Sequence, residues 1–135
     1  MTTPNEYGSF EIKYQIIFKN VSKHLECFNR HGVTIIGGVA PAFQDILAAP
    51  DLDTYNFSRL KRITSGGASF PVALYQQLKE KFQVPILEMY GMTENAATLT
   101  SNPLHLQKPE SVGCALDGMS VRVVNNCGRQ LPPEK

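Results

Sequence analysis

The sequence alternates short apolar runs with segments of helical periodicity, and the connections between them are short. The apolar runs are rich in β-branched residues and are expected to form strands at residues 12–18, 33–36, 60–64 and 84–89. Two strands joined through a helix by short connections pack as a right-handed crossover between parallel neighbours. The alternation therefore predicts an α/β fold with a partial doubly wound, largely parallel sheet covered by helices.

Three segments between these runs have apolar residues at the spacing of an amphipathic helix. Their buried positions are expected to be Val21, Leu25 and Phe28, then Phe43, Ile46 and Leu47, and finally Leu74, Leu78 and Phe82. Gly32 is expected to end the first helix, because glycine is the usual residue just beyond a helix end. Pro41 suits the first turn of the second helix, where its missing N–H is harmless. Ser69 is expected to cap the third helix.

The pattern changes after Thr98. A loop-rich stretch follows, marked by Pro103, Pro109, Gly113 and Gly118. Val121 and Val123 then alternate with polar residues, and residues 125–128 have the composition of a hairpin turn. We therefore expect residues 1–102 to form the α/β part and residues 103–135 to begin an antiparallel, β-rich subdomain that is truncated.

Charge and cysteine content exclude several classes of function. The 13 Lys and Arg residues balance 12 Asp and Glu residues, so no basic surface for nucleic acid is expected. The longest apolar run, about residues 33–43, contains two glycines and a proline and is too short for a transmembrane segment. The three cysteines are widely spaced and form no CxxC pair. They predict free thiols in a reducing compartment, and hence a cytoplasmic protein.

The first segment with chemical potential is Ser65-Gly66-Gly67-Ala68, between an expected strand and an expected helix. Two glycines allow a flat ligand or a phosphate to approach the backbone, and a helix N-terminus offers free N–H groups. The alternative is that the glycines serve only tight packing of the turn. The segment is neither a P-loop nor a nucleophile elbow, because the required GK[ST] and GxSxG residues are absent.

The second segment is Tyr90-Gly91-Met92-Thr93-Glu94, at the expected carboxyl end of a strand. Ligands of open α/β sheets bind beyond that end. An aromatic ring can stack on a base, a hydroxyl can bind a phosphate and a carboxylate can hold Mg²⁺. The alternative is an ordinary turn in which Tyr90 is packed and Glu94 is solvated.

Together these segments resemble the motifs of the adenylate-forming (AMP-binding) superfamily, most closely those of acyl-CoA synthetases. Residues 90–94 resemble its YGxTE motif, residues 65–68 resemble SGGAP, and Ser111-Val112-Gly113 with Gly118 resembles SVGxPxPG. The three motifs occur in the family's order and spacing. Departures are Ser69 in place of the SGGAP proline, and Ala115 and Asp117 in place of both prolines of the third motif.

The resemblance implies a role for each matching residue. The nucleotide-binding residues would be Gly66, Gly67, Ala68, Glu88, Met89, Tyr90 and Gly91. Residues 66–68 would form one wall of an adenine slot and Tyr90 would stack on the opposite face of the base. Glu88 and Met89 would border the adenine and acyl sites. Thr93 and Glu94 would be catalytic, Thr93 by binding the α-phosphate and Glu94 as a ligand of Mg²⁺.

The implied enzyme activates a fatty or aromatic acid with ATP as an acyl-adenylate and transfers the acyl group to CoA. The family's triphosphate loop is expected before Met1, and its ribose aspartate and catalytic lysine are expected beyond Lys135. The chain is therefore expected to be an internal fragment of the large N-terminal domain, inactive alone, with the remainder of its own chain as partner. The alternatives are a luciferase-like or peptide-synthetase adenylation domain, or a non-catalytic split-gene remnant that acts as a binding piece.

Overall fold

The computed structural model describes residues 21–132 of the 135-residue chain. Its helices are α1 (Val21–His31), α2 (Ala40–Leu47) and α3 (Val72–Phe82), with 3-10 turns η1 (Leu52–Thr54) and η2 (Thr93–Asn95). Its strands are β1 (Ile35–Gly38), β2 (Arg62–Gly66), β3 (Ile86–Tyr90), β4 (Thr100–Ser101) and β5 (Cys114–Ala115). The expected strand at residues 12–18 lies outside the described residues.

The strands form one sheet in the order β1-β2-β3-β4-β5. β1, β2 and β3 are parallel, while β4 and β5 add antiparallel pairs beside β3. Ile36, Ile63 and Ile86 lie side by side in this register. The mixed α/β fold with a largely parallel sheet that becomes antiparallel is therefore confirmed. The boundary between residues 102 and 103 stays a prediction.

Each described parallel strand begins two residues later than its apolar run. The lead-in residues Val33, Leu60 and Val84 pack against the core without pairing in the sheet. The runs continue into glycines, and Gly38 and Gly66 pair with neighbouring strands. Hydrophobicity marks which residues are buried, whereas the ladder is set by backbone hydrogen bonds, so the two boundaries differ.

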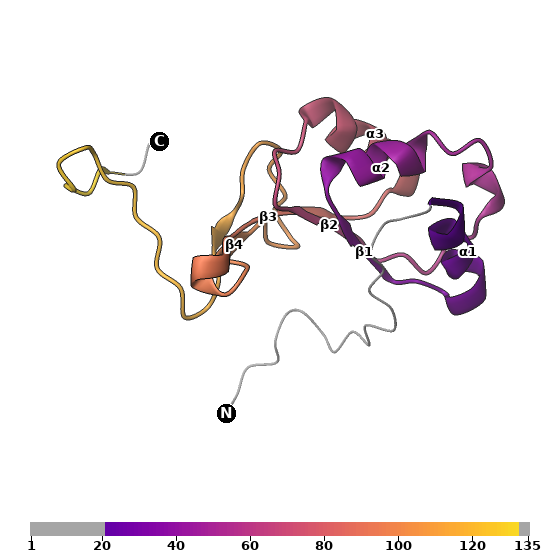
Figure 1. The fold of residues 1–135 in the computed structure, drawn as a ribbon, viewed down its shortest axis with the longest axis horizontal. Coiled ribbons are helices and arrows are strands. Elements are labelled where there is room, and N and C mark those ends of the chain that lie inside the picture. The colour runs from indigo at the N-terminus through magenta and orange to yellow at the C-terminus, as the bar shows by residue number, and fades with distance from the viewer. Residues whose placement is uncertain (1–20, 133–135) are drawn as a thin grey trace.

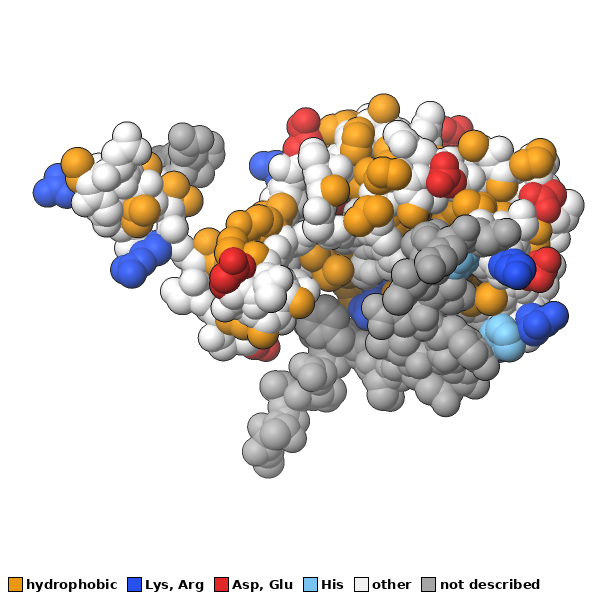
Figure 2. Space-filling view, viewed as in Figure 1, with side chains coloured by type: hydrophobic (Ala, Val, Ile, Leu, Met, Phe, Trp, Pro, Cys, Tyr) orange, Lys and Arg blue, Asp and Glu red, His pale blue; other side chains and the backbone are white. Residues whose placement is uncertain are grey.

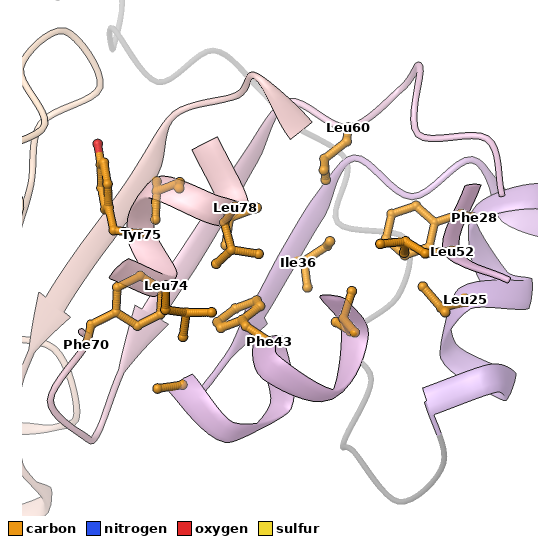
Figure 3. Close-up of a cluster of buried hydrophobic side chains, with 14 residues drawn as sticks. Leu25, Phe28, Ile36, Phe43, Leu52, Leu60, Phe70, Leu74, Tyr75 and Leu78 are labelled. Carbon is orange, nitrogen blue, oxygen red and sulfur yellow. The ribbon is translucent and has the colours of Figure 1, made fainter. Parts of the chain in front are cut away.

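The core lies between the sheet and helices α2 and α3, with α1 extending it beyond β1 (Figures 1 and 3). Phe43, Ile63, Leu78 and Ile86 have no exposed surface. Phe43 meets Phe70 edge to face, with ring centroids 5.9 Å apart. Burial of one such side chain stabilises the fold by about 1.5–3 kcal/mol. The buried side chains of this layer therefore hold α3 against the sheet after the end of β2.

Two of the three expected helix signals are confirmed. Gly32 follows α1 with φ +60°, and its N–H donates to the Phe28 carbonyl at 3.1 Å. Pro41 lies in the first turn of α2. The expected Ser69 cap is wrong, because α3 begins at Val72 with Pro71 at the N-cap position. The helical conformation is unfavourable for the residue that precedes a proline, so the chain becomes helical only after Pro71.

The C-terminal segment after β5 extends away from the body of the molecule (Figure 1). The expected hairpin turn at residues 125–128 is confirmed by an antiparallel bridge between Val124 and Gln130. The Asn125 side-chain oxygen accepts the Cys127 and Arg129 N–H groups at 3.0 and 2.9 Å. Apolar side chains are exposed along this segment (Figure 2), namely Met119, Val121, Val123, Val124 and Leu131.

No helix within residues 21–132 combines the length and apolarity needed to cross a bilayer. Cys27, Cys114 and Cys127 are free thiols. Over the same residues, no group of three or more His, Cys, Asp or Glu side chains is placed to hold a metal ion.

Candidate functional site

Two cavities lie where β1, β2 and β3 end. The larger, which we call the strand-end groove, has a volume of about 950 Å³. It is lined by Gly37, Gly38, Val39, Thr64, Gly66, Gly67, Met89, Tyr90, Gly91, Met92, Thr93, Ala96, Ala97 and Thr98. The smaller, which we call the Glu88 cavity, has a volume of about 300 Å³. It is lined by Ser65, Ala68, Ser69, Phe70, Pro71, Val72, Glu88, Met89, Glu110 and Val112.

The alternation of side chains along the strands explains why two cavities form. Ser65 and Glu88 are partners across β2 and β3, two residues beyond the core pair Ile63 and Ile86, so they lie on the helix-covered face. Gly66 and Met89 are the next pair and belong to the opposite face, which the groove occupies. Met89 lines both cavities and marks where they meet.

The turn after β2 separates the cavities. A side chain at Gly66 would place its Cβ 3.1 Å from the Met89 carbonyl oxygen, so the two strand ends approach closely. Gly67 has φ +81°, which favours glycine, and nothing lies within 4 Å of where its Cβ would be. The backbone of this turn is therefore open to a ligand, with Gly67 on the groove and Ala68 on the Glu88 cavity.

Residues 90–98, which we call the YGMTE loop, fold into a compact turn at the end of β3. The Met92 N–H donates to the Asn95 side-chain oxygen at 3.0 Å, and the Ala97 N–H donates to the Met92 carbonyl at 3.1 Å. The Leu99 N–H closes the loop by donating to the Tyr90 carbonyl at 2.8 Å. This network holds η2, so Thr93 and Glu94 are presented from a fixed turn.

The structure brings together most residues that the sequence singled out. Gly66, Gly67, Met89, Tyr90, Gly91 and Thr93 line the strand-end groove, while Ala68 and Glu88 line the Glu88 cavity. Tyr90 is 44% exposed and so is not packed as the ordinary-turn alternative expects, whereas the exposed Glu94 agrees with that alternative. Glu94 is exposed, directly follows Thr93 and lines neither cavity.

Glu88 has an unusual environment for a carboxylate. Its side chain is only 7% exposed, and one of its oxygens, Oε1, has no hydrogen-bond partner. Burial raises the pKa of Glu88, a hydrogen bond from the Glu110 backbone N–H opposes that rise, and the Glu110 charge adds to it. The Ser65 hydroxyl, also without a partner, is 2% exposed. Buried polar groups without partners are uncommon and point to a missing ligand or solvent.

Several residues of the site were not identified from the sequence. Gly37, Gly38 and Val39 line the groove. Gly37-Gly38 follows a β-branched run, and Gly66-Gly67 does the same. That parallel was an available signal. Glu110 carried no signal at all, because its place beside Glu88 depends on how the loop after β4 folds back.

Asn102 holds that loop in place. It is 2% exposed, and its backbone N–H donates to the Glu88 carbonyl at 2.9 Å. Its side-chain amide donates to the Ser111 carbonyl at 2.6 Å and accepts from the Lys108 N–H at 3.3 Å. Nothing in the local sequence distinguishes it from a surface asparagine, so it too was missed.

Replacing Asn102 with alanine is expected to lower the free energy of unfolding by about 1–3 kcal/mol, because buried backbone groups of the loop lose their partner. Urea denaturation of the variant would measure this loss. Asn125→Ala is the matched control, since that side chain binds backbone N–H groups in an exposed turn. An equal loss in both variants would contradict the role given to Asn102.

The family model for AMP-binding enzymes matches residues 14–135. The chain belongs to the AMP-binding enzyme family. This confirms the resemblance carried by the three motifs.

Relatives of this AMP-binding chain include CoA ligases. It is 32% identical to the mitochondrial acyl-coenzyme A synthetase ACSM2 of Rattus norvegicus over 76% of the chain and 18% of that protein. It is 30% identical to 4-coumarate–CoA ligase 1 of Glycine max over 84% of the chain and 41% of that protein. The chain thus spans less than half the length of each of these relatives.

Solved structures in the family share the fold. The anthranilate CoA ligase AuaEII, in complex with anthranoyl-AMP, superimposes with a TM-score of 0.77 at 27% identity, over 85% of this chain and 22% of that one. ATP-bound MatB from Rhodopseudomonas palustris gives 0.75 at 30% identity, over 87% of this chain and 23% of that one. Members of the family with related folds therefore bind an acyl-adenylate or ATP.

Proposed function

We propose that this chain supplies the adenine and α-phosphate part of the nucleotide site of an ATP-dependent carboxylic acid–CoA ligase. The observation that carries the proposal is that Gly66, Gly67, Tyr90 and Thr93, from the ends of two adjacent parallel strands, line one groove. Family membership and the names of the CoA ligases above support it. Ligands of parallel α/β sheets bind at this end.

The Glu88 cavity would receive the adenine base. Its volume of about 300 Å³ is at the lower end for small-molecule sites. The Ala68 side of the turn supplies one wall, and the unpartnered Glu88 oxygen is an acceptor for the amino group of adenine. Tyr90 would stack on the base where the cavities meet, next to Met89.

The strand-end groove would receive the α-phosphate and the acid. Thr93 lines it and would donate its hydroxyl to the α-phosphate. The exposed Glu94 carboxylate follows Thr93 in η2 and suits Mg²⁺, which usually takes one or two protein carboxylates together with substrate phosphates. When bound there, the ion would neutralise charge that develops on the phosphates.

The proposed reaction has two steps and no covalent enzyme intermediate. A carboxylate oxygen of the acid attacks the α-phosphorus, and pyrophosphate leaves to give the acyl-adenylate. The thiol of CoA releases its proton to solvent, its sulfur then attacks the acyl carbon, and AMP leaves. The residues of this chain contribute position and charge complementarity, since the groove holds the reacting groups in line.

The acid would be fatty or aromatic, in keeping with relatives named for medium-chain acyl, 4-coumarate and anthranilate substrates. The remainder of a longer chain would complete the groove around the triphosphate and ribose. The three free thiols support a reducing compartment such as the cytoplasm.

The 135 residues alone are expected to form no acyl-adenylate and to bind ATP only weakly. Thr93, Glu94 and Tyr90 stand at an open surface, and affinity requires that a ligand be enclosed and its charges satisfied. Pyrophosphate release with a panel of fatty and aromatic acids would measure activity.

Amide NMR spectra of the chain with AMP would test the placement of the nucleotide. Residues 66–68 and 89–93 are expected to shift together. Shifts confined to other parts of the chain would overturn the proposed site, and Mg²⁺-dependent turnover by the purified chain would overturn its inactivity.

A further inference from the structure

The YGMTE loop contains two strained residues in succession. Ala96 and Ala97 have φ of +58° and +89°, in the left-handed region that is unfavourable for a residue with a Cβ. Strained backbone persists only where the surrounding structure determines it, and it gathers at functional sites. In Figure 1 the turn η2, which leads into these residues, is the short orange coil next to β4. Some contact must therefore hold this turn against its own strain.

One side chain ties the two ends of the turn together. The Asn95 side-chain oxygen accepts the Met92 N–H at 3.0 Å, and the Asn95 backbone N–H donates to the Met92 carbonyl at 3.2 Å. The two residues are thus joined in both directions across η2. Within residues 21–132, this is the one hydrogen bond between a side chain and the backbone of the YGMTE loop. The other bonds of the loop join backbone groups to each other.

Asn95 is placed to act through its neighbours. It is half-buried and lines neither cavity, whereas Thr93 lines the strand-end groove and Glu94 is exposed. Both of these residues lie between Met92 and Asn95, inside the segment that the amide closes. Loss of the side-chain bond would leave the Met92 N–H without its acceptor and allow the segment to unwind.

We propose that Asn95 is a positioning residue that keeps the YGMTE loop closed against the strain of residues 96–97. The closed loop holds Thr93 and Glu94 at one fixed spacing for the α-phosphate and its ion. The inference rests on the roles given to these two residues in the proposed function. The Glu88 cavity is lined by residues outside the turn, so opening of the loop should slow the reaction more than it weakens nucleotide binding.

The first experiment measures the loop in the 135-residue chain without ligand. The Ala97 and Leu99 N–H groups close the loop by donating to backbone carbonyls, so their hydrogen exchange reports how often it opens. Asn95→Leu is similar in size but has no acceptor, and exchange should become about two- to tenfold faster. Asn95→Asp keeps an oxygen acceptor at the same position and should keep the slow exchange.

A second-site variant tests the strain itself. Ala97→Gly removes the Cβ that makes φ +89° unfavourable, and it leaves Asn95 unchanged. When added to Asn95→Leu, it should slow the exchange again by about two- to fivefold. The matched control is Asn126→Leu, which introduces the same side chain at an exposed position of the C-terminal hairpin and should leave exchange in the loop unchanged.

The second experiment uses an intact ligase that carries this sequence. Asn95→Leu should lower kcat about 10–100-fold, because a displacement of about 1 Å has a cost of this order, while the KM for ATP changes less than about threefold. The Mg²⁺ concentration that gives half the maximal rate should rise, which a mere loss of folded enzyme would not cause. Ala97→Gly in the same variant should recover part of kcat, because it restores the turn.

Each result supports or overturns the positioning role. Loop exchange in Asn95→Leu that matches the Asn126→Leu control would overturn it, and so would a kcat and Mg²⁺ requirement equal to those of the control. If Ala97→Gly recovers neither the exchange nor kcat in Asn95→Leu, Asn95 does not act against the strain of the loop and the inference is wrong.

Failure of the proposed function has a different signature. AMP added to the unsubstituted chain should shift the amides of residues 66–68 and 89–93. If these shifts appear while Asn95→Leu keeps the kcat and Mg²⁺ requirement of the control, the nucleotide site stands and the positioning role is wrong. If AMP shifts none of these residues, the proposed site is wrong, and the role given to Asn95 is wrong with it.

Discussion

Gly91→Ala is expected to disorganise the YGMTE loop, although the change adds a single methyl group. A Cβ at Gly91 would lie 1.4 Å from the Ala97 carbonyl oxygen and 2.8 Å from the Thr98 Cα. Both obstacles are backbone atoms, so no rotamer change can relieve the clash. The chain must shift between residues 91 and 98, where Ala96 and Ala97 already have φ of 58° and 89°.

The expected loss of stability is about 1–3 kcal/mol, as for other insertions of methyl groups into packed space. In a chain of this size that lowers the melting temperature by about 4 °C for each kcal/mol. The effect on function should be larger, because Thr93 and Glu94 are presented by the same loop. A displacement of about 1 Å can slow a positioned reaction about 100-fold.

The matched control is Gly37→Ala. Gly37 lines the same groove, and its Cβ would meet only the Thr64 hydroxyl, at 3.1 Å. That hydroxyl, which donates to the Ile36 carbonyl at 3.3 Å, needs to shift by only a few tenths of an ångström, so a much smaller drop in melting temperature is expected. Amide spectra should show changes across residues 90–98 in Gly91→Ala alone. A Gly91→Ala chain that matches the control in both measurements would show that the loop is not fixed as described.

The alternation of apolar runs and helical segments predicted the fold, because the strands of a parallel sheet are buried beneath the helices that connect them. Ile36, Ile63 and Ile86 all lie within or beside the expected strands and form one row of the core. Local geometry was harder to predict. Ser69 has the residue type of a cap, yet the proline two positions later delays the helix until Val72.

The site was predictable to the extent that its residues belong to strand ends. Gly66 and Tyr90 follow neighbouring strands, so a parallel sheet brings them together without further information. The resemblance implied that Glu88 borders the adenine site. Whether its carboxyl oxygen Oε1 has a hydrogen-bond partner depends on the loop after β4, which Asn102 holds in place. Such long-range contacts leave no periodic pattern in the sequence.

Loss of the Glu94 charge is expected to have the other large effect, in an intact ligase that carries this sequence. Glu94→Gln keeps the size and hydrogen-bonding capacity of the side chain but replaces a hard anionic oxygen ligand with a neutral amide. The affinity for Mg²⁺ should therefore fall at least about 10–100-fold, the range seen even for residues that act on a metal indirectly.

Tyr90→Ala separates this effect from a general loss of the site. Stacking contributes about 0.5–1.5 kcal/mol, so that variant should raise the KM for ATP about 2–10-fold and leave the Mg²⁺ dependence unchanged. Pyrophosphate release measured over matched Mg²⁺ and ATP titrations resolves the two effects, with Asp117→Asn as an exposed carboxylate control. Glu94→Gln should need more Mg²⁺ at every ATP concentration, whereas Tyr90→Ala should need more ATP at saturating Mg²⁺. A Glu94→Gln enzyme with the Mg²⁺ requirement of the control would return Glu94 to an ordinary solvated side chain and require the metal ligand to be sought outside residues 21–132.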